Sequence, residues 1–176
     1  LFWINVSFLG IGIAEEVPSI GILLMENLGK EEDQFWARGI TEDLIIKVAG
    51  AGLVRVAPMK EIKKVNMDDE FEDIARQLHV KYLLISSIYK HENGFDLRCQ
   101  MIDAQSGNSE YAHKWSEPLN KSPTIVGNLA DNILNTLQVD SKQTMIAAES
   151  INPEAYEFYL KGKYRYNNRK NMEDME

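Results

Sequence analysis

The stretch SIGILLMENLGKEEDQFWARGITEDLIIKV, residues 19–48, decides the fold class because it reads as a buried strand followed by a helix. The segment Ser19–Met25 is apolar at nearly every position, and Asn27 and Gly29 close it. A short apolar run bounded by turn residues is typical of a strand that is covered on both faces. We therefore expect a central strand here.

The second half of this stretch predicts a helix. Apolar residues recur every four positions from Trp36 to Val48, which places them on one stripe that faces a sheet. The pattern stops near Gly50, as is common at a helix C-terminus. The segment Leu53–Ala57 then alternates as a second strand, and Pro58 ends it because proline lacks the N–H that a sheet requires. A strand–helix–strand unit results.

Further along the chain, the pattern predicts a helix, a meander and another helix. The first helix covers Asp68–Val80, with acidic residues in its first turn. The three strands of the meander are Tyr82–Tyr89, Phe95–Ile102 and Tyr111–Trp115, and Asn93-Gly94 favours a hairpin turn between the first two. Ser122 as N-cap and Pro123 in the first turn open a helix that extends to Leu137.

The sequence thus predicts an α/β (α+β) fold, in which a mixed sheet of about five strands is flanked by helices and followed by a C-terminal helical extension. The expected domain boundaries are an apolar segment at 1–18, the α/β domain at 19–139, a linker at 140–151 and a helical segment at 152–176. Residues 1–14 carry no charge but are fewer than the roughly 20 that a membrane helix needs. They are either the outer end of a truncated transmembrane helix or a buried strand or helix of the core.

Composition and motifs argue against several functions. A net charge of −8 disfavours a general nucleic-acid surface, which needs clustered Lys and Arg. The single cysteine, Cys99, cannot form an internal disulfide, and His79, His91 and His113 stand far apart without a zinc motif. The chain contains no phosphate-binding loop and no nucleophile elbow. We expect no catalytic, cofactor-binding or metal-binding residue, and no cofactor.

Aromatic residues are the main candidates for partner contacts. The predicted contacts are Trp36, Trp115, Tyr156, Tyr159, Tyr164 and Tyr166, the last four belonging to a dense aromatic band that also contains Phe158. Aromatic side chains are enriched among the residues that dominate protein interfaces. Two alternatives remain: the tryptophans belong to the core, and the aromatic band packs back onto the domain itself.

A small-molecule site is the second hypothesis. In open α/β sheets, ligands bind outside the carboxyl ends of the strands. Asn27 and Gly29 follow the first predicted strand, and Asp103 follows the Phe95–Ile102 strand. These three residues are therefore the candidate loop site.

Several segments resemble the amino-terminal-domain-like module of TolB that occurs in bacterial multidomain proteins. The most specific is Phe35–Leu44, FWARGITEDL, which is similar to the family's YFADGITEDL helix. The other matching segments, in chain order, are Ser19–Leu28, Leu53–Ala57, Ile74–Leu84, Met101–Gly107 and Asn152–Gly162. The sequence departs from the family at Met25 and Glu26, where Pro-Phe is usual, and at Arg38, where Asp is frequent.

The resemblance implies a non-catalytic interaction or sensory module on the periplasmic or extracytoplasmic face, anchored in the membrane through an upstream helix. The implied parent protein carries a class III adenylate or guanylate cyclase or a winged-helix regulator, and residues 152–176 would begin a tetratricopeptide region. The expected partner is another protein or the chain's own repeat array, and a homodimer is a further option. Alternatives are a small-molecule-sensing periplasmic domain and a stand-alone cell-envelope assembly protein.

Overall fold

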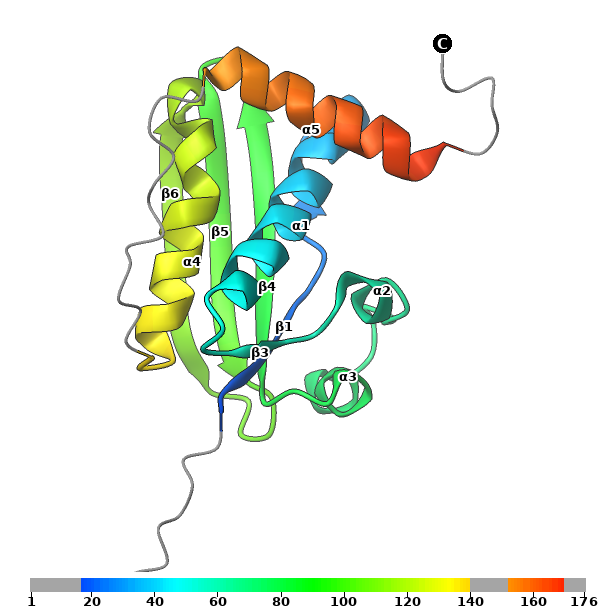
Figure 1. Ribbon diagram of the computed structural model, residues 1–176, viewed down its shortest axis with the longest axis vertical. Coiled ribbons are helices and arrows are strands. Elements are labelled where there is room, and N and C mark those ends of the chain that lie inside the picture. The colour runs from blue at the N-terminus through cyan, green and yellow to red at the C-terminus, as the bar shows by residue number, and fades with distance from the viewer. Residues whose placement is uncertain (1–16, 140–151, 170–176) are drawn as a thin grey trace, which may run out of the picture.

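Residues 17–139 and 152–169 are described in the computed structural model, and in them a mixed sheet is flanked by helices (Figure 1). The apolar segment at 1–14, the linker at 140–151 and the end of the predicted helical segment after residue 169 lie outside the described residues. The six strands of the sheet are β1 (Ser19–Ile22), β2 (Glu26–Asn27), β3 (Arg55–Val56), β4 (Tyr82–His91), β5 (Gly94–Asp103) and β6 (Ser109–Pro118).

The sheet has a parallel half and an antiparallel half. Its strand order is β3-β1-β4-β5-β6, and β2 pairs with β4 beyond the end of β1. β1 runs parallel to both β3 and β4, whereas β4, β5 and β6 form an antiparallel meander. The central position predicted for Ser19–Met25 is confirmed, with Ile20 and Ile22 at most 1% exposed. The mixed α+β class is also confirmed.

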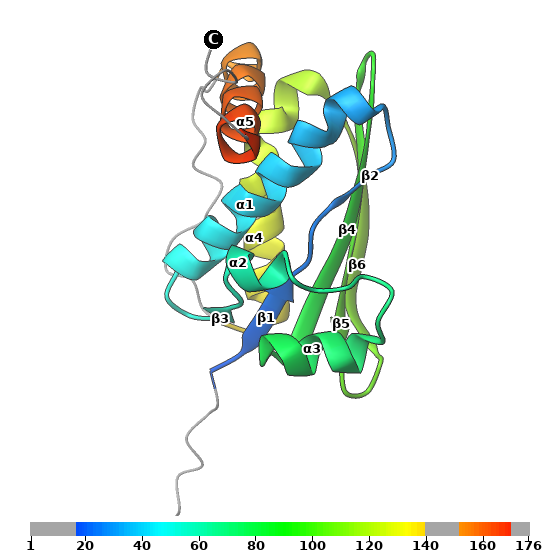
Figure 2. The same ribbon diagram turned by 90° about the vertical axis from the view of Figure 1, so that its right-hand side faces the viewer.

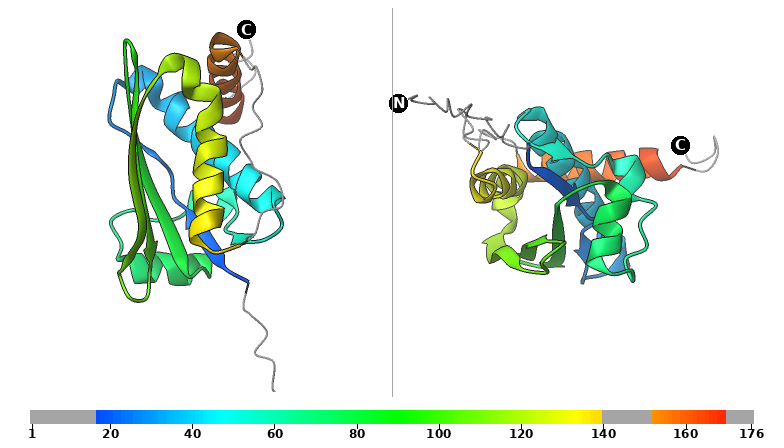
Figure 3. Two further views of the ribbon diagram at one scale, coloured as in Figure 1. Left: turned by 90° about the vertical axis from the view of Figure 1, so that its left-hand side faces the viewer. Right: turned by 90° about the horizontal axis from the view of Figure 1, so that it is seen from below.

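The helical elements are η1 (Glu31–Asp33), α1 (Gln34–Gly50), α2 (Met59–Ile62), α3 (Phe71–Leu78), η2 (Leu119–Thr124), α4 (Ile125–Thr136) and α5 (Pro153–Asn168). Figure 2 shows α1, α4 and α5 on the same side of the meander. The other face of the meander is left open to solvent, as the left view of Figure 3 shows. Leu97 and Met101 are accordingly buried while Arg98 and Gln100 are exposed, so the predicted dry and wet faces of β5 are confirmed.

Three local features differ from what the sequence predicted. α2, a single turn after Pro58, was not predicted, because four residues are too few to display a helical stripe. α3 begins at Phe71, three residues later than expected. Ser122 does not cap α4: it lies in η2, is fully buried, and its hydroxyl has no hydrogen-bond partner among the described residues.

The meander depends on a close approach between β5 and β6 at Gly94. Gly94 pairs with Pro118 of β6, and a Cβ built on Gly94 would collide with the carbonyl oxygen of Glu117. Glycine at position 94 is therefore favoured for two reasons: it suits the turn between β4 and β5, and it leaves space for the backbone of β6.

Candidate protein-interaction site around the C-terminal helix

The C-terminal helix α5 begins at a well-formed N-terminus. The Asn152 side-chain oxygen accepts a hydrogen bond from the backbone N–H of Glu154 at 2.8 Å, and Pro153 occupies the first helical position. Both residue types favour a helix start, because Asn satisfies an unpaired N–H and Pro has none to satisfy. From there α5 runs across α1, as the orange and red ribbon in Figure 1 shows.

The inner face of α5 packs into the domain. Tyr156 is 7% exposed and Leu160 is fully buried. The Tyr156 ring meets Trp36 of α1 edge to face, with the ring centroids 6.1 Å apart. Leu160 lies over Gly39, where α1 presents no side chain. The apolar contact between α1 and α5 therefore extends over about one helical turn.

A polar cluster closes the far end of this contact. The Lys163 ammonium lies 2.6 Å from an Asp43 oxygen and 3.4 Å from a Glu42 oxygen. The Tyr159 hydroxyl donates to Asp43 at 3.2 Å, and the Asn167 amide donates to Glu42 at 3.1 Å. Burial lowers the pKa of Lys163 and the Asp43 carboxylate raises it, with a net shift upward. Lys163 therefore stays charged and holds α5 on α1.

Two buried polar atoms at the same contact have no hydrogen-bond partner among the described residues. They are the indole Nε1 of Trp36 and the hydroxyl of Tyr156. Burial also raises the pKa of Tyr156. A buried group without a partner loses its hydrogen bond to water and gains none in return. The helix is thus held less firmly than its apolar burial alone would indicate.

The outer face of α5 exposes large aromatic side chains. Phe158 is 72% exposed, Tyr166 62% and Tyr159 50%, and we call these three residues the aromatic face of α5. Phe158 and Tyr166 are eight residues apart, so they lie on one side of the helix with Gly162 between them. The guanidinium of Arg169 lies 3.9 Å from the centre of the Tyr166 ring. Clustered exposed aromatics are typical of binding surfaces.

The predicted contact residues therefore separate into three groups. Trp36 and Tyr156 are buried, so they cannot touch an outside partner while α5 is docked, and for them the expectation of an exposed contact is corrected. Tyr164 and Trp115 are partly buried, and Trp115 lines a cavity beneath α4. Tyr159 and Tyr166 are exposed. Phe158 was not among the predicted contacts, although its helical spacing from Tyr166 was visible in the sequence.

The candidate loop site is not brought together. Asn27 pairs with Ile88 near the end of β4, whereas Asp103 pairs with Tyr82 at its beginning, so they lie at opposite ends of the sheet. β5 runs antiparallel to β4, and the rule about carboxyl ends applies only to parallel strands. Asn27 instead accepts a hydrogen bond from the backbone N–H of Gly29 in a local turn.

Asp103 also has a local role. Its carboxylate accepts hydrogen bonds from the backbone N–H groups of Ser106 and Gln105, at 3.1 Å and 3.0 Å. These bonds, with that of Ser106 the stronger influence, hold the pKa of Asp103 below its usual value. The residue therefore shapes the turn between β5 and β6.

Within residues 17–139 and 152–169, no three His, Cys, Asp or Glu side chains are grouped so that they could hold a metal ion. None of the helices in these ranges combines the length and the apolar character needed to cross a bilayer. The thiol of Cys99 is buried in β5, and this burial raises its pKa to about 12. It is therefore poorly suited to act as a nucleophile at neutral pH.

No family model matches the chain. Over 152 residues it is 26% identical to a protein of Rhizobium meliloti (strain 1021) that bears the provisional name adenylate cyclase 3. The match covers 83% of this chain but only 26% of that protein, so the chain spans about a quarter of its relative's length.

Two solved structures share the fold. TolB from Acinetobacter baumannii superimposes with a TM-score of 0.51 at 13% identity, over 70% of this chain and 29% of the TolB chain. Lipoprotein GNA1162 from Neisseria meningitidis superimposes with a TM-score of 0.50 at 12% identity, over 71% of this chain and 99% of the lipoprotein chain. The chain therefore has a TolB-like fold.

Proposed function

We propose that this chain is a non-catalytic protein-interaction module of a larger bacterial signalling protein, which presents α5 to its partner outside the cytoplasm. The aromatic face of α5 is the observation that carries the proposal. Phe158, Tyr159 and Tyr166 remain exposed although Tyr156 and Leu160 fix the helix on the domain. Because α5 is already folded and docked, binding through its exposed aromatic rings does not include the entropy cost of ordering the helix.

The comparisons support the wider setting. The Rhizobium meliloti relative is named as a cyclase, and the matched part is about a quarter of its length, so catalysis would belong to the remaining part. The similar TolB and lipoprotein structures support placement in the cell envelope, with a membrane anchor elsewhere in the parent chain. The partner would be either another protein or a following helical repeat of tetratricopeptide type. The effect of partner binding on α5 would be transmitted to the output domain through α5 and α1.

Site-specific photo-crosslinking in the natural parent protein tests the proposal. A photoreactive phenylalanine analogue is placed at Phe158 or Tyr166, with Ile46 as the matched control, since Ile46 is a 66% exposed apolar residue on α1. We expect the two α5 positions to capture one defined partner or one following segment of the parent chain, and the α1 position to capture neither. Equal capture at all three positions would contradict a specific surface.

A second experiment asks whether the surface matters for signalling. The double variant Phe158→Ala/Tyr166→Ala removes exposed rings only, so thermal stability should be unchanged within about 0.5 kcal/mol. When the photoreactive analogue is placed at Tyr159 in this double variant, we expect crosslinking to the partner to be lost. We also expect a weaker response of the output domain. A wild-type response in this variant would reject the proposed function.

A further inference from the structure

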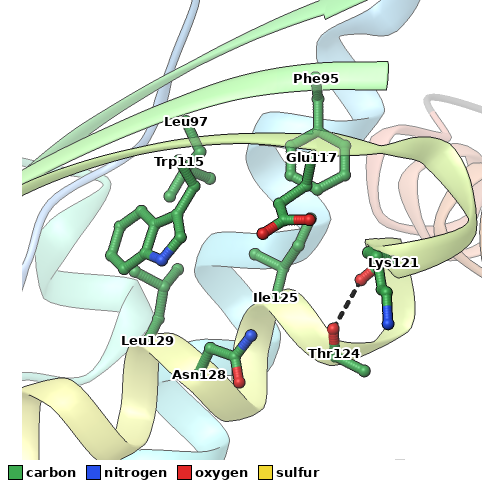
Figure 4. A pocket seen from close by; sticks show the side chains of 9 residues that line it. All are labelled: Phe95, Leu97, Trp115, Glu117, Lys121, Thr124, Ile125, Asn128 and Leu129. Carbon is green, nitrogen blue, oxygen red and sulfur yellow. Dashed lines mark hydrogen bonds between the residues drawn. The ribbon is translucent and has the colours of Figure 1, made fainter. Parts of the chain in front are cut away.

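A cavity separate from α5 lies between β5, β6 and α4. Its volume is about 270 Å³. The apolar lining residues are Phe95, Leu97, Trp115, Ile125 and Leu129, and the polar ones are Glu117, Lys121, Thr124 and Asn128. Phe95 and Leu97 are at most 2% exposed, so the deep wall is fixed by the core of the domain. Figure 4 shows the apolar side chains facing one another from the two strands and α4, with Lys121 and Thr124 of η2 at the edge.

The carboxylate of Glu117 has no partner in this cavity. It is half-buried on β6, yet it makes no hydrogen bond and no ion pair with any other residue of 17–139 or 152–169. In Figure 4 it stands between the rings of Trp115 and Phe95, while the Lys121 side chain extends away from it. A partly desolvated carboxylate is stabilised by a cation, and although Lys121 lines the same cavity, no cation of the described residues lies within ion-pair distance of Glu117.

The ring of Trp115 also favours a positively charged ligand. Trp115 is two residues from Glu117 on β6, and both side chains line the cavity. The face of an indole ring attracts a cation by electrostatics, more strongly than the other aromatic side chains do. The net charge of −8 adds a long-range attraction for positively charged solutes. Three independent features therefore favour the same sign of charge.

We propose that this cavity binds a small organic cation, a protonated amine that carries one ring or a short branched chain. The ammonium group would lie against Glu117 and Trp115, and the apolar body would lie on Leu97, Ile125 and Leu129. The volume of about 270 Å³ suits such a ligand. It exceeds the roughly 150 Å³ of an engineered cavity that holds benzene, and it is smaller than most pockets for drug-sized molecules. The proposal is independent of any partner of α5.

The test is an NMR titration of the chain with benzylamine, benzyl alcohol and benzoate, three probes of similar size that differ in charge. Benzylamine is expected to bind with a Kd of about 1 mM, the range for a ligand this small. The shifted amide signals should be those of β6 and α4. Benzyl alcohol should bind at least about tenfold more weakly, because a charge-assisted hydrogen bond is replaced by a neutral one. Benzoate should not bind.

Glu117→Gln removes the charge and preserves the shape of the side chain, and Glu110→Gln on the same strand is the matched control. Glu117→Gln should weaken benzylamine at least about tenfold and leave benzyl alcohol unchanged, which also reports that the cavity is intact. Glu110→Gln should change neither affinity. Equal binding of the amine and the alcohol, no binding of the amine, or an unchanged amine affinity in Glu117→Gln would each overturn the proposal.

Discussion

Gly39 of α1 and Leu160 of α5 are so close that a methyl group built on Gly39 would lie 2.5 Å from Leu160 Cδ2. The absence of a side chain at Gly39 therefore sets how closely the two helices can approach. Leu160 is fully buried as a result. Any group added at this glycine must push α5 outward or force Leu160 into another rotamer.

Gly39→Ala is expected to loosen α5 while it stabilises α1 itself. Alanine favours a helix interior by about 1 kcal/mol over glycine, but here its methyl group collides with Leu160. Amide hydrogen exchange should become faster in Pro153–Asn168 and stay unchanged or become slower in Gln34–Gly50. Gly162→Ala is the control, because no atom lies within 4 Å of a Cβ built there, and it should slow exchange in α5. Unchanged exchange in α5 of the Gly39 variant would refute this account.

Tyr156→Phe is expected to stabilise the docked helix by about 1 kcal/mol, because it removes a buried hydroxyl that has no partner and keeps the ring against Trp36. Tyr159→Phe is the matched variant and should destabilise by a similar amount. It loses the hydrogen bond to Asp43. Urea unfolding of both variants measures the two changes. Equal effects in the same direction would mean that hydroxyl pairing does not govern this contact.

Alkaline pH is expected to release α5. Burial raises the pKa of Tyr156, burial and Asp43 raise that of Tyr159, and the pKa of Lys163 is also raised. Because each folded pKa exceeds its unfolded value of roughly 10, the stabilisation is complete below that pH and is lost as pH rises through the folded values. Circular dichroism should show helix loss that moves to higher pH in Tyr156→Phe.

Tyr111 on β6 provides the control for this titration. Burial raises its pKa to about 12, yet it lies on the meander and not on α5. Tyr111→Phe should therefore leave the alkaline transition of α5 where it is in the wild type. A shift as large as that of Tyr156→Phe would assign the transition to general unfolding.

His79→Gly is expected to raise the stability of the domain by about 0.5–1 kcal/mol. His79 ends α3 with φ at 54°, in the left-handed region where a Cβ is unfavourable. The melting temperature should rise by about 1–4 °C for a chain of this size. His79→Ala keeps the Cβ and should give no such gain. Equal melting temperatures for the two variants would show that backbone strain at this position is negligible.

The main elements of the fold could be predicted from the sequence because their periodicity is local. The strand at Ser19, the helix through Trp36 and the alternation along β5 each follow from neighbouring residues. β2 and α2 could not, since two and four residues are too few to display a period. The prediction that Ser122 caps α4 was wrong because a Ser-Pro pair is compatible both with the start of an α-helix and with the 3-10 turn that precedes α4.

The candidate site was less predictable, because burial on α5 depends on contacts between distant residues. Lys163 and Asp43 are 120 positions apart in the sequence, and no local pattern pairs them. The aromatic band has rings on more than one side of the helix, so it could not be divided into inner and outer residues before the covered face was known. The cavity near Glu117 likewise depends on the placement of α4 over β6.

The positions of β1 and α5 determine how the domain would bear mechanical load within a longer chain. β1 starts at one end of the molecule and α5 ends near the other, so tension through both would run along its length (Figure 1). Hydrogen bonds from β3 and β4 hold β1 along its two edges and would have to shear together. The contacts of α5 with α1 are arranged in a row and can be peeled in turn, from Lys163 to Leu160 and then Tyr156. The helix would detach at a lower force than the sheet, and a pull on the chain would thereby expose Trp36.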